Sequence, residues 1–216
     1  MVSRAGGTLR GNDTSTKEMH GHEPVGETDA ALVARAAGGD GDAFAGLYSR
    51  YQAPMYRFAL QMTGSAAVAE DIVQEVFIVL MRSLGRYDSG RPLAAYLYGI
   101  VRNTTRQRLR RERRLVPLDY IADHSAPAEF AENLEHREHL FLLRRAIVAM
   151  PSRFREVLVM CDLHMMSYEL VAASLGCPVG TVRSRLHRAR GRLAERMQQF
   201  KTSAARPSRG AERWAL

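Results

Sequence analysis

The segment from Ser167 to Arg192, SYELVAASLGCPVGTVRSRLHRARGR, contains the start and stop signals of two short helices joined by a tight turn. The Ser167 hydroxyl can accept a hydrogen bond from an unpaired amide of the first helical turn. Gly176 can adopt the left-handed conformation in which helices often end, and Pro178 suits the first turn of a new helix, where its missing N–H is not needed. The segment therefore predicts a helix, a turn and a second helix.

The second predicted helix combines one apolar stripe with basic surfaces. Arginines and Ser184 project from the sides outside the stripe, as in a helix that reads the major groove of DNA. An amphipathic surface helix with a solvated basic face is the alternative. The preceding helix, the glycine turn and the proline favour the DNA-binding interpretation. The stripe, which would face the rest of its domain, consists of Val182, Leu186, Ala189 and Leu193.

The charge of the chain favours a polyanionic partner. The net charge is +8 and the pI is near 10.0, and basic side chains that meet phosphates release condensed counterions. An anionic membrane surface would also suit this charge. However, no apolar run approaches the ~18 residues of a membrane span, and residues 1–26 lack the apolar segment of a secretory signal. We therefore expect a cytoplasmic protein with no membrane contact of its own.

Cysteine and histidine usage favours neither a disulfide framework nor a metal centre. The two cysteines, Cys161 and Cys177, are expected to be core thiols. Cys161 with His164 and His136 with His139 have helical spacing, but two ligands seldom hold a metal. The chain shows no paired catalytic acids, nucleophile constellation or phosphate-binding glycine loop. We expect no enzymatic activity, no metal and no cofactor.

Helical patterns predict an all-α fold of two small domains joined by a flexible linker. We expect a disordered leader at 1–28, a first domain at 29–115, the linker at 116–133, a second domain at 134–200 and a flexible basic tail at 201–216. Pro54 is expected to kink the second helix, whose apolar side includes Tyr48. Capping residues predict helix starts at Asp29, at Asp40 or Asp42, at Ser65 and at Ser152.

The third predicted helix has an acidic and polar face, formed by Glu70, Asp71, Gln74 and Glu75. In a basic protein, such a face suggests docking onto a basic partner surface. Alternatively, the face is simply solvated, and its acids are favoured because they lie near the positive end of the helix dipole. The spacing of the residues supports the two interpretations equally.

A turn-rich loop, RYDSGRP at residues 86–92, precedes a helix predicted at 93–114 whose far half is strongly basic. Aromatic rings beside arginines suit single-stranded nucleic acid, because bases stack on the rings while arginines neutralise the backbone. Alternatively, Tyr87 and Tyr96 are half-buried core residues and the arginines are surface charge.

Taken together, these motifs resemble the sigma factors of bacterial RNA polymerase, in the extracytoplasmic-function subfamily of the sigma-70 family. The resemblance covers residues 29–196, and the order and separation of the motifs make it specific. Its pieces are GDGDAF (39–44), AEDIVQEVF (69–77), YDSGRPLAAYLYGIVRN (87–103), MPSRFREV (150–157) and SYELVAASLGCPVGTVRSRLHRAR (167–190).

The resemblance implies a role for each element. Docking on core polymerase would use Asp71, Gln74 and Glu75. The minus-ten promoter element would be read and opened by Tyr87, Ser89, Arg91, Tyr96, Arg102, Asn103 and Arg106, with a base captured out of the stack. The minus-thirty-five element would be read by Thr181, Arg183, Ser184, Arg185, His187, Arg188 and Arg190.

Four positions depart from the family pattern. Tyr96 stands where tryptophan is usual, Gln107 where aspartate is common, Met165 where glycine is common, and Leu170 where glutamate is usual. Tyrosine keeps an aromatic surface, whereas Leu170 removes a possible capping box with Ser167.

The resemblance also implies regulation by an anti-sigma factor. We therefore expect an initiation factor that binds core polymerase and promoter DNA. Two other functions are compatible with parts of the sequence: a decoy that sequesters an anti-sigma factor, and a helix-turn-helix regulator that works without docking on polymerase. The arginines on both basic helices argue against the decoy.

Overall fold

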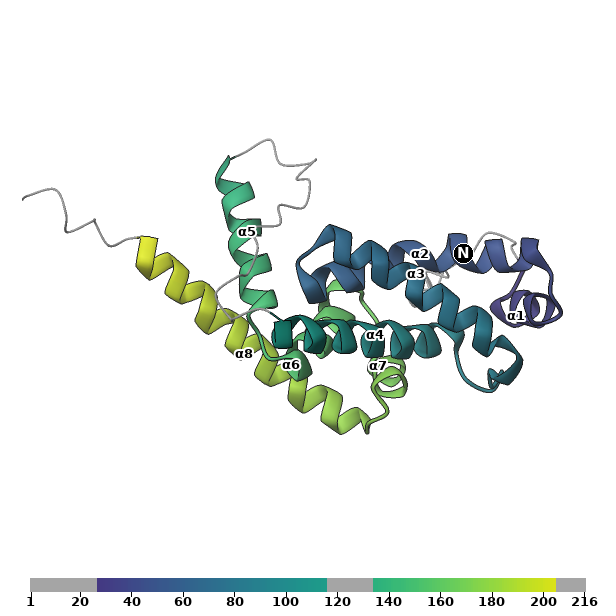
Figure 1. The fold of residues 1–216 in the computed structure, drawn as a ribbon. Coiled ribbons are helices and arrows are strands. Elements are labelled where there is room, and N and C mark those ends of the chain that lie inside the picture. The colour runs from purple at the N-terminus through teal and green to yellow at the C-terminus, as the bar shows by residue number, and fades with distance from the viewer. Residues whose placement is uncertain (1–26, 116–133, 205–216) are drawn as a thin grey trace, which may run out of the picture.

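A computed structural model describes residues 27–115 and 134–204, and every regular element within these ranges is helical (Figure 1). The all-α prediction is confirmed. The predicted leader up to residue 26, the linker at 116–133 and the tail beyond residue 204 lie outside the described residues. The first domain contains α1 (Asp29–Ala37), α2 (Gly41–Thr63), α3 (Ala66–Ser83), the 3-10 helix η1 (Leu84–Arg86) and α4 (Leu93–Leu115). The second contains α5 (Leu134–Val148), α6 (Ser152–Leu158), the π-helix η2 (Val159–Leu163), α7 (Tyr168–Leu175) and α8 (Val179–Ala204).

Local capping explains most helix boundaries. The side chains of Asp40, Ser65 and Ser167 each accept a hydrogen bond from a backbone N–H of the following turn, as predicted. Gly176 ends α7 in the left-handed conformation, with a φ of 62°.

Two predicted caps are wrong. Thr28 rather than Asp29 caps α1, because Thr28 has the extended backbone that a cap requires, and Asp29 instead accepts a hydrogen bond from the Tyr51 hydroxyl. Pro151 occupies the cap position of α6, so that Ser152 is the first helical residue and makes no side-chain cap bond.

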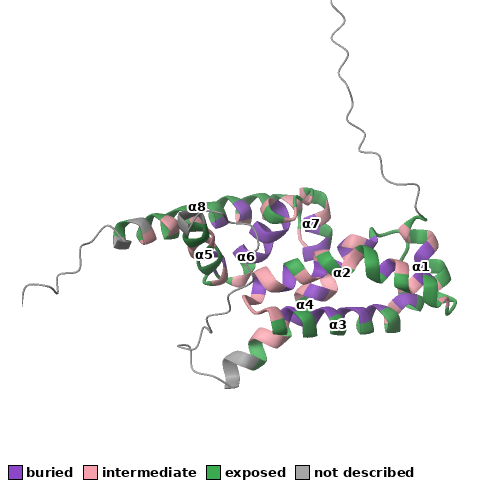
Figure 2. Ribbon diagram, turned by 90° about the horizontal axis from the view of Figure 1, so that it is seen from above, coloured by how far each residue is buried: buried purple, intermediate pink, exposed green. Residues whose placement is uncertain are grey.

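The core of the first domain lies between α2, α3 and α4 (Figure 2). α2 runs through Pro54 without interruption. Tyr48, predicted on the apolar side, is 38% exposed and packs its ring against Phe77, with centroids 4.6 Å apart. The buried side of α2 consists instead of Ala43, Leu47, Met55, Phe58, Ala59 and Met62.

The core of the second domain is built around α6 and η2. All residues from 154 to 161 are buried, which is typical of a helix enclosed on every side. The predicted stripe of α8 packs toward this centre: Val182, Leu186 and Ala189 are buried and Leu193 is half-buried. None of the described helices is both long and apolar enough to span a membrane.

The two domains pack against each other through α4 and α7, and Figure 1 shows α4 running between the α2–α3 pair and α7. At Gly99 of α4, a Cβ would lie 3.7 Å from the backbone oxygen of Ser174 in α7, which is an ordinary van der Waals contact. A methyl group would therefore fit between the two helices at this point.

His164 forms a polar bridge between the domains. The Tyr98 hydroxyl of α4 donates to Nδ1 at 2.6 Å, and Nε2–H donates to Oε1 of Gln61 in α2 at 2.8 Å. This bonding suits the neutral imidazole. Burial, together with the nearby Arg57 guanidinium, lowers the pKa of His164 to about 4.

The domain contact should therefore weaken in acid. A depressed histidine pKa stabilises the folded form above the unfolded pKa of about 6.5, and this contribution is lost as the pH falls from about 6.5 toward 4. We expect His164→Phe to flatten the decline of unfolding free energy between about pH 7 and 5, measured by urea denaturation. His187→Phe changes an exposed histidine of α8 and should leave the decline as in the parent; equal slopes for all three proteins would contradict the assignment.

The backbone conformation at Met165, where glycine is common in the family, is one that glycine adopts more easily than other residues. Met165 is 82% exposed, and among the described residues it alone has a positive φ without being glycine, at 52°. The left-handed conformation costs a side-chain-bearing residue ~1–2 kcal/mol, and the entropy that glycine loses offsets about half of that. Met165→Gly should raise the unfolding free energy by about 0.5–1 kcal/mol in urea melts. Met165→Ala keeps the Cβ and should give no gain; equal stabilisation by both would mean that side-chain exposure matters instead.

Candidate nucleic-acid interface

α8 carries all the residues predicted to read the upstream element. Its buried stripe faces the domain, which leaves the predicted readers on the remaining sides. Thr181 and Arg185 are half-buried beside the stripe. The exposed readers are Arg183, Ser184, His187, Arg188 and Arg190.

Two of the predicted readers on α8, Arg183 and Arg190, have partners elsewhere in the domain. Arg190 donates to both oxygens of Asp162, with Nε–Oδ2 and Nη2–Oδ1 distances of 2.9 and 2.6 Å, and this pairing raises the pKa of Arg190. The guanidinium of Arg183 lies over the Tyr168 ring, 5.8 Å from its centroid. Arg190 therefore ties α8 to η2, while Arg188, farther toward the start of α8, is exposed to solvent.

The loop before α4 and the start of α4 form an aromatic platform. The rings of Tyr87 and Tyr96 pack with centroids 5.2 Å apart, and the Tyr87 hydroxyl donates to the backbone carbonyl of Arg91. Burial raises the pKa of Tyr87. Ser89 and Arg91 are exposed next to this half-buried pair, so rings and a cation are available on one surface.

The other residues predicted to meet the minus-ten element divide between two sides of α4. Asn103 is exposed, as is Gln107 one turn later. Arg102 and Arg106 instead reach across to the second domain, where their Nε atoms lie 2.8 and 2.5 Å from the two oxygens of Glu156. The sequence patterns did not indicate this division.

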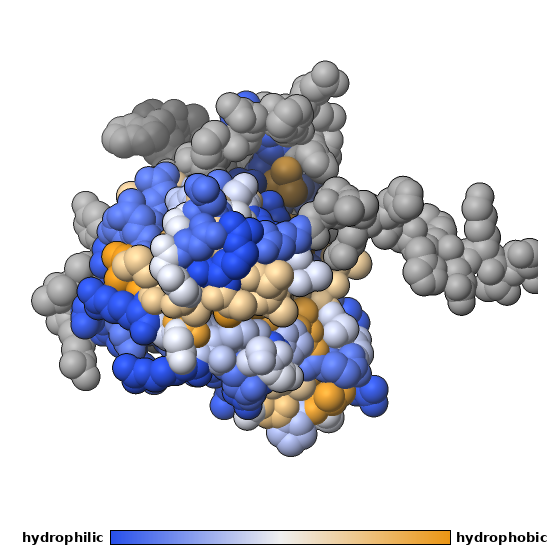
Figure 3. Space-filling view, turned by 90° about the vertical axis from the view of Figure 1, so that its right-hand side faces the viewer, coloured by the Kyte–Doolittle hydropathy of each residue, from blue (hydrophilic) through white to orange (hydrophobic). Residues whose placement is uncertain are grey.

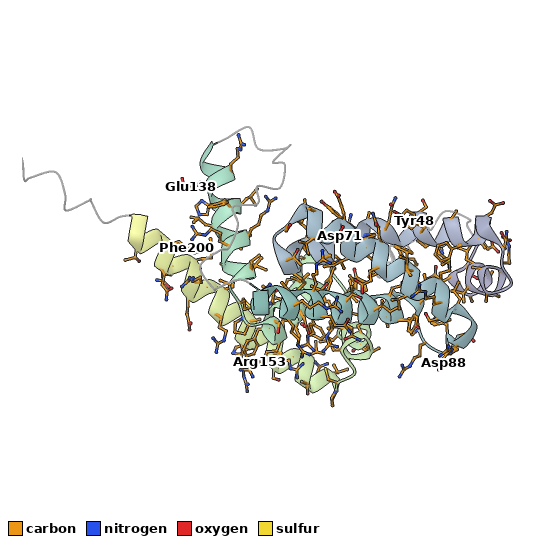
Figure 4. The ribbon with its side chains drawn as sticks, viewed as in Figure 1. Tyr48, Asp71, Asp88, Glu138, Arg153 and Phe200 are labelled. Carbon is orange, nitrogen blue, oxygen red and sulfur yellow. The ribbon has the colours of Figure 1, made fainter. Side chains whose placement is uncertain are left out.

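The acidic face of α3 is exposed, as Glu70, Asp71, Gln74 and Glu75 all face solvent. Asp71 forms an ion pair with Arg108 of α4 at 2.6 Å. Such pairs at a surface contribute little, about 0–1 kcal/mol, so the pair would not prevent a partner from engaging this face. Figure 4 places Asp71 and Tyr48 along the same side of the molecule, away from Arg153 of the second domain.

Apolar side chains continue this face toward the end of α3, where Ile78 and Met81 are 44% and 56% exposed. Figure 3, which looks onto the end of the molecule that bears α1, shows bands of apolar surface between strongly hydrophilic patches. Exposed apolar side chains bordered by polar ones are the arrangement expected of a protein-docking site, whose apolar centre has a polar rim.

Four polar residues at the domain contact were not predicted as functional: Gln61, Tyr98, Arg155 and Glu156. The available signal for Arg155 and Glu156 was their place within the otherwise apolar run FREVLVMC at residues 154–161, since a charged residue buried in such a run requires a partner.

The chemistry of the described residues does not suggest a metal centre, because they contain no cluster of three or more metal-ligating side chains. In the Cys161–His164 pair, both ring nitrogens of His164 are hydrogen-bonded, and burial, together with Asp162, raises the pKa of the Cys161 thiol to about 11. The side chain of His136 lies outside the described residues.

Two family models match the chain: sigma-70 region 2 at residues 47–115 and sigma-70 region 4 at residues 140–193. The first match contains α3 and α4, and the second contains α6, α7 and most of α8. The candidate docking and nucleic-acid surfaces thus fall within the two matched segments.

The chain is similar to characterised sigma factors along most of its length. It is 34% identical to the ECF RNA polymerase sigma-E factor of Escherichia coli, over 79% of this chain and 95% of that protein. It is 35% identical to the ECF RNA polymerase sigma factor SigE of Mycolicibacterium smegmatis, over 70% of this chain and 60% of that protein.

The fold has a solved counterpart in the sigma factor RpoE of Bartonella quintana, crystallised in complex with the anti-sigma factor NepR. The TM-score is 0.60 at 26% identity, and the match covers 72% of this chain and 96% of that one. Helical architecture, segment matches and sequence identity agree: the chain belongs to the extracytoplasmic-function subfamily of sigma-70 factors.

Proposed function

We propose that this protein is a non-catalytic transcription initiation factor, which binds core RNA polymerase and directs it to a small set of promoters. The observation that carries the proposal is the presence in one chain of an exposed acidic face on α3 and basic surfaces on α4 and α8. A regulator that binds DNA by itself would need only the basic surfaces. Purified protein added to sigma-free core polymerase on genomic DNA fragments should give transcript starts that share two motifs at fixed spacing.

The first domain would join polymerase binding to promoter opening. The α3 face would dock on a basic surface of polymerase through Asp71, Gln74 and Glu75. On the other side, the Tyr87–Tyr96 platform would receive an unstacked base, with Ser89, Arg91, Asn103 and the α4 arginines around it. Unstacking costs a few kcal/mol, and contacts to the captured base would offset that cost.

The second domain would read the upstream promoter element with α8. Its N-terminal half carries Arg183, Ser184, His187 and Arg188 on exposed sides, and a helix of this width fits the major groove. When both domains are docked on polymerase, the spacing between the two promoter elements would be fixed by the distance between α4 and α8 in the complex.

An anti-sigma factor is the expected regulatory partner. The sigma factor RpoE of Bartonella quintana, which shares this fold, was crystallised with the anti-sigma factor NepR. The protein would bind promoter DNA and polymerase in the cytoplasm. The proposed role requires no catalytic group, metal or cofactor.

Charge reversal on α3 should separate polymerase binding from DNA binding. Glu75→Lys puts a cation where a basic partner surface docks, so we expect the affinity for core polymerase to fall at least ~10-fold, measured by fluorescence anisotropy. Glu195→Lys makes the same charge change at an exposed position of α8 and should leave that affinity within about twofold. Unchanged transcription by the Glu75 variant would favour a regulator that works without docking.

Arg188 should contribute specificity at the upstream element. If it contacts a guanine with two hydrogen bonds, Arg188→Ala will weaken duplex binding by about 1–3 kcal/mol and relax the preference at one base pair. Arg196→Ala is the control, because this exposed arginine lies two turns later on α8 and packs over the Phe200 ring. A similar, sequence-independent loss for both variants would assign Arg188 to phosphate contact.

A further inference from the structure

The carboxylate of Asp29, in the first turn of α1, makes two contacts with α2 that take no part in the proposed function. Oδ1 pairs with Nη1 of Arg50 at 2.5 Å, and Oδ2 accepts a hydrogen bond from the Tyr51 hydroxyl. Arg50 also donates from Nη2 to the backbone carbonyl of Glu27 at 2.8 Å. Both oxygens of Asp29 therefore hold the start of α1 on two consecutive residues of α2.

Of these two contacts, the hydrogen bond with Tyr51 is the one that lies toward the interior. Tyr51 is half-buried and packs against the core, whereas Arg50 is exposed. An exposed ion pair contributes little, because solvent and salt screen its charges. A hydrogen bond to a carboxylate is stronger than one between neutral groups. The Tyr51 hydroxyl is therefore the more effective link between Asp29 and the rest of the domain.

This link lies beside the aromatic platform formed by Tyr87 and Tyr96. α1 packs against η1, which ends directly before Tyr87, and Asp88 lies at the end of the molecule that bears α1 (Figures 1 and 4). Tyr51 packs against the same cluster of buried residues as the two platform rings. The negative charge of Asp29 adds to burial in raising the pKa of Tyr87, as expected for neighbouring groups.

The platform in turn sets the placement of the loop that follows η1. The Tyr87 hydroxyl donates to the backbone carbonyl of Arg91, and the Arg91 N–H donates to the backbone carbonyl of Asp88 at 3.1 Å. The Asp88 side chain accepts a hydrogen bond from the Gly90 N–H at 2.9 Å. These bonds close the loop on itself, so its position relative to the domain depends on the Tyr87 ring.

We propose that Asp29 and Tyr51 are positioning residues for promoter opening, which hold the aromatic platform and its loop in the arrangement that captures an unstacked base. This inference rests on the proposed function, which assigns the platform to the minus-ten element. Neither residue touches DNA in this role: Asp29 fixes α1 through the Tyr51 hydroxyl, and α1 supports η1 and Tyr87. Ring stacking depends on geometry, so a displaced platform binds the base less tightly even though both rings are present.

Three variants test the role of the hydrogen bond between Tyr51 and Asp29. Tyr51→Phe keeps the ring and removes the donor, and Asp29→Ala removes the acceptor. Asp29→Asn keeps an oxygen that can accept from Tyr51 and loses the charge. Arg35→Ala is the matched control, because Arg35, in the last turn of α1, also makes two ion pairs, with Glu27 and Asp40.

The measurement is the affinity of the full chain, bound to core polymerase, for a fluorescein-labelled single-stranded DNA that carries the minus-ten motif shared by the parent's transcript starts. We expect Tyr51→Phe and Asp29→Ala to weaken this binding about 5- to 10-fold, at the lower end of what one base–aromatic stack contributes. Asp29→Asn and Arg35→Ala should stay within about twofold of the parent. The affinities for core polymerase and for the upstream duplex should not change, because the acidic face of α3 and the readers on α8 are other surfaces.

A double-mutant cycle separates positioning from a general loss of stability. Since Asp29 acts through Tyr87, Asp29→Ala should cost less than about twofold once Tyr87→Ala has removed the ring. A change that merely loosens the domain would weaken binding equally in both backgrounds. Circular dichroism checks that each variant folds, and Tyr51→Phe decides the outcome if an Asp29 variant does not.

Four results would overturn the positioning role. These are parental binding by Tyr51→Phe, a loss for Asp29→Asn as large as for Asp29→Ala, a comparable loss for Arg35→Ala, and equal losses with and without the Tyr87 ring. Failure of the proposed function would look different: the parent mixed with core polymerase would give no specific transcript starts, and the positioning role would fall with it.

Discussion

The buried neighbours Arg155 and Glu156 are the interaction on which the arrangement of the two domains depends. The Arg155 guanidinium donates to the carbonyls of Met62, Val148 and Met150. Met62 and Val148 lie at the ends of α2 and α5, where carbonyls lack partners within their own helix and the helix dipole favours a cation. Arg155 thus joins the end of α2 in the first domain to the end of α5 in the second. Glu156 ties α4 to the same place through its ion pairs with Arg102 and Arg106.

This pair also adds a polar component to the contact between the domains. Exposing the buried aliphatic and aromatic side chains of the protein to water would raise its free energy. Glu156 and the arginines of α4, in contrast, would exchange one polar partner for another on separation. Apolar side chains of both domains also meet there, because the buried hydrophobic residues of the two domains form one continuous cluster. The contact therefore combines ion pairs with apolar burial.

The features that could be predicted from the sequence were those with local causes. Ser65, Ser167 and Gly176 act within one helical turn, so their roles were evident from the residues around them. The apolar stripe of α8 could be predicted because its residues recur at intervals of three and four, the period of a helix. The partners of Arg102 and Arg106 could not be predicted, because Glu156 lies about fifty residues away in sequence and a basic helix face does not reveal which arginines will meet another domain. The same limit applies to His164, whose bonds to Tyr98 and Gln61 depend on the final packing.

The surfaces that remain exposed set the order in which the proposed steps can occur. Gln74 and Glu75 on α3 face solvent while Arg102 is covered, so docking on polymerase does not require the domains to separate first. DNA contact by Arg102 does require it. Docking through α3 can therefore precede any contact between the covered α4 arginines and DNA.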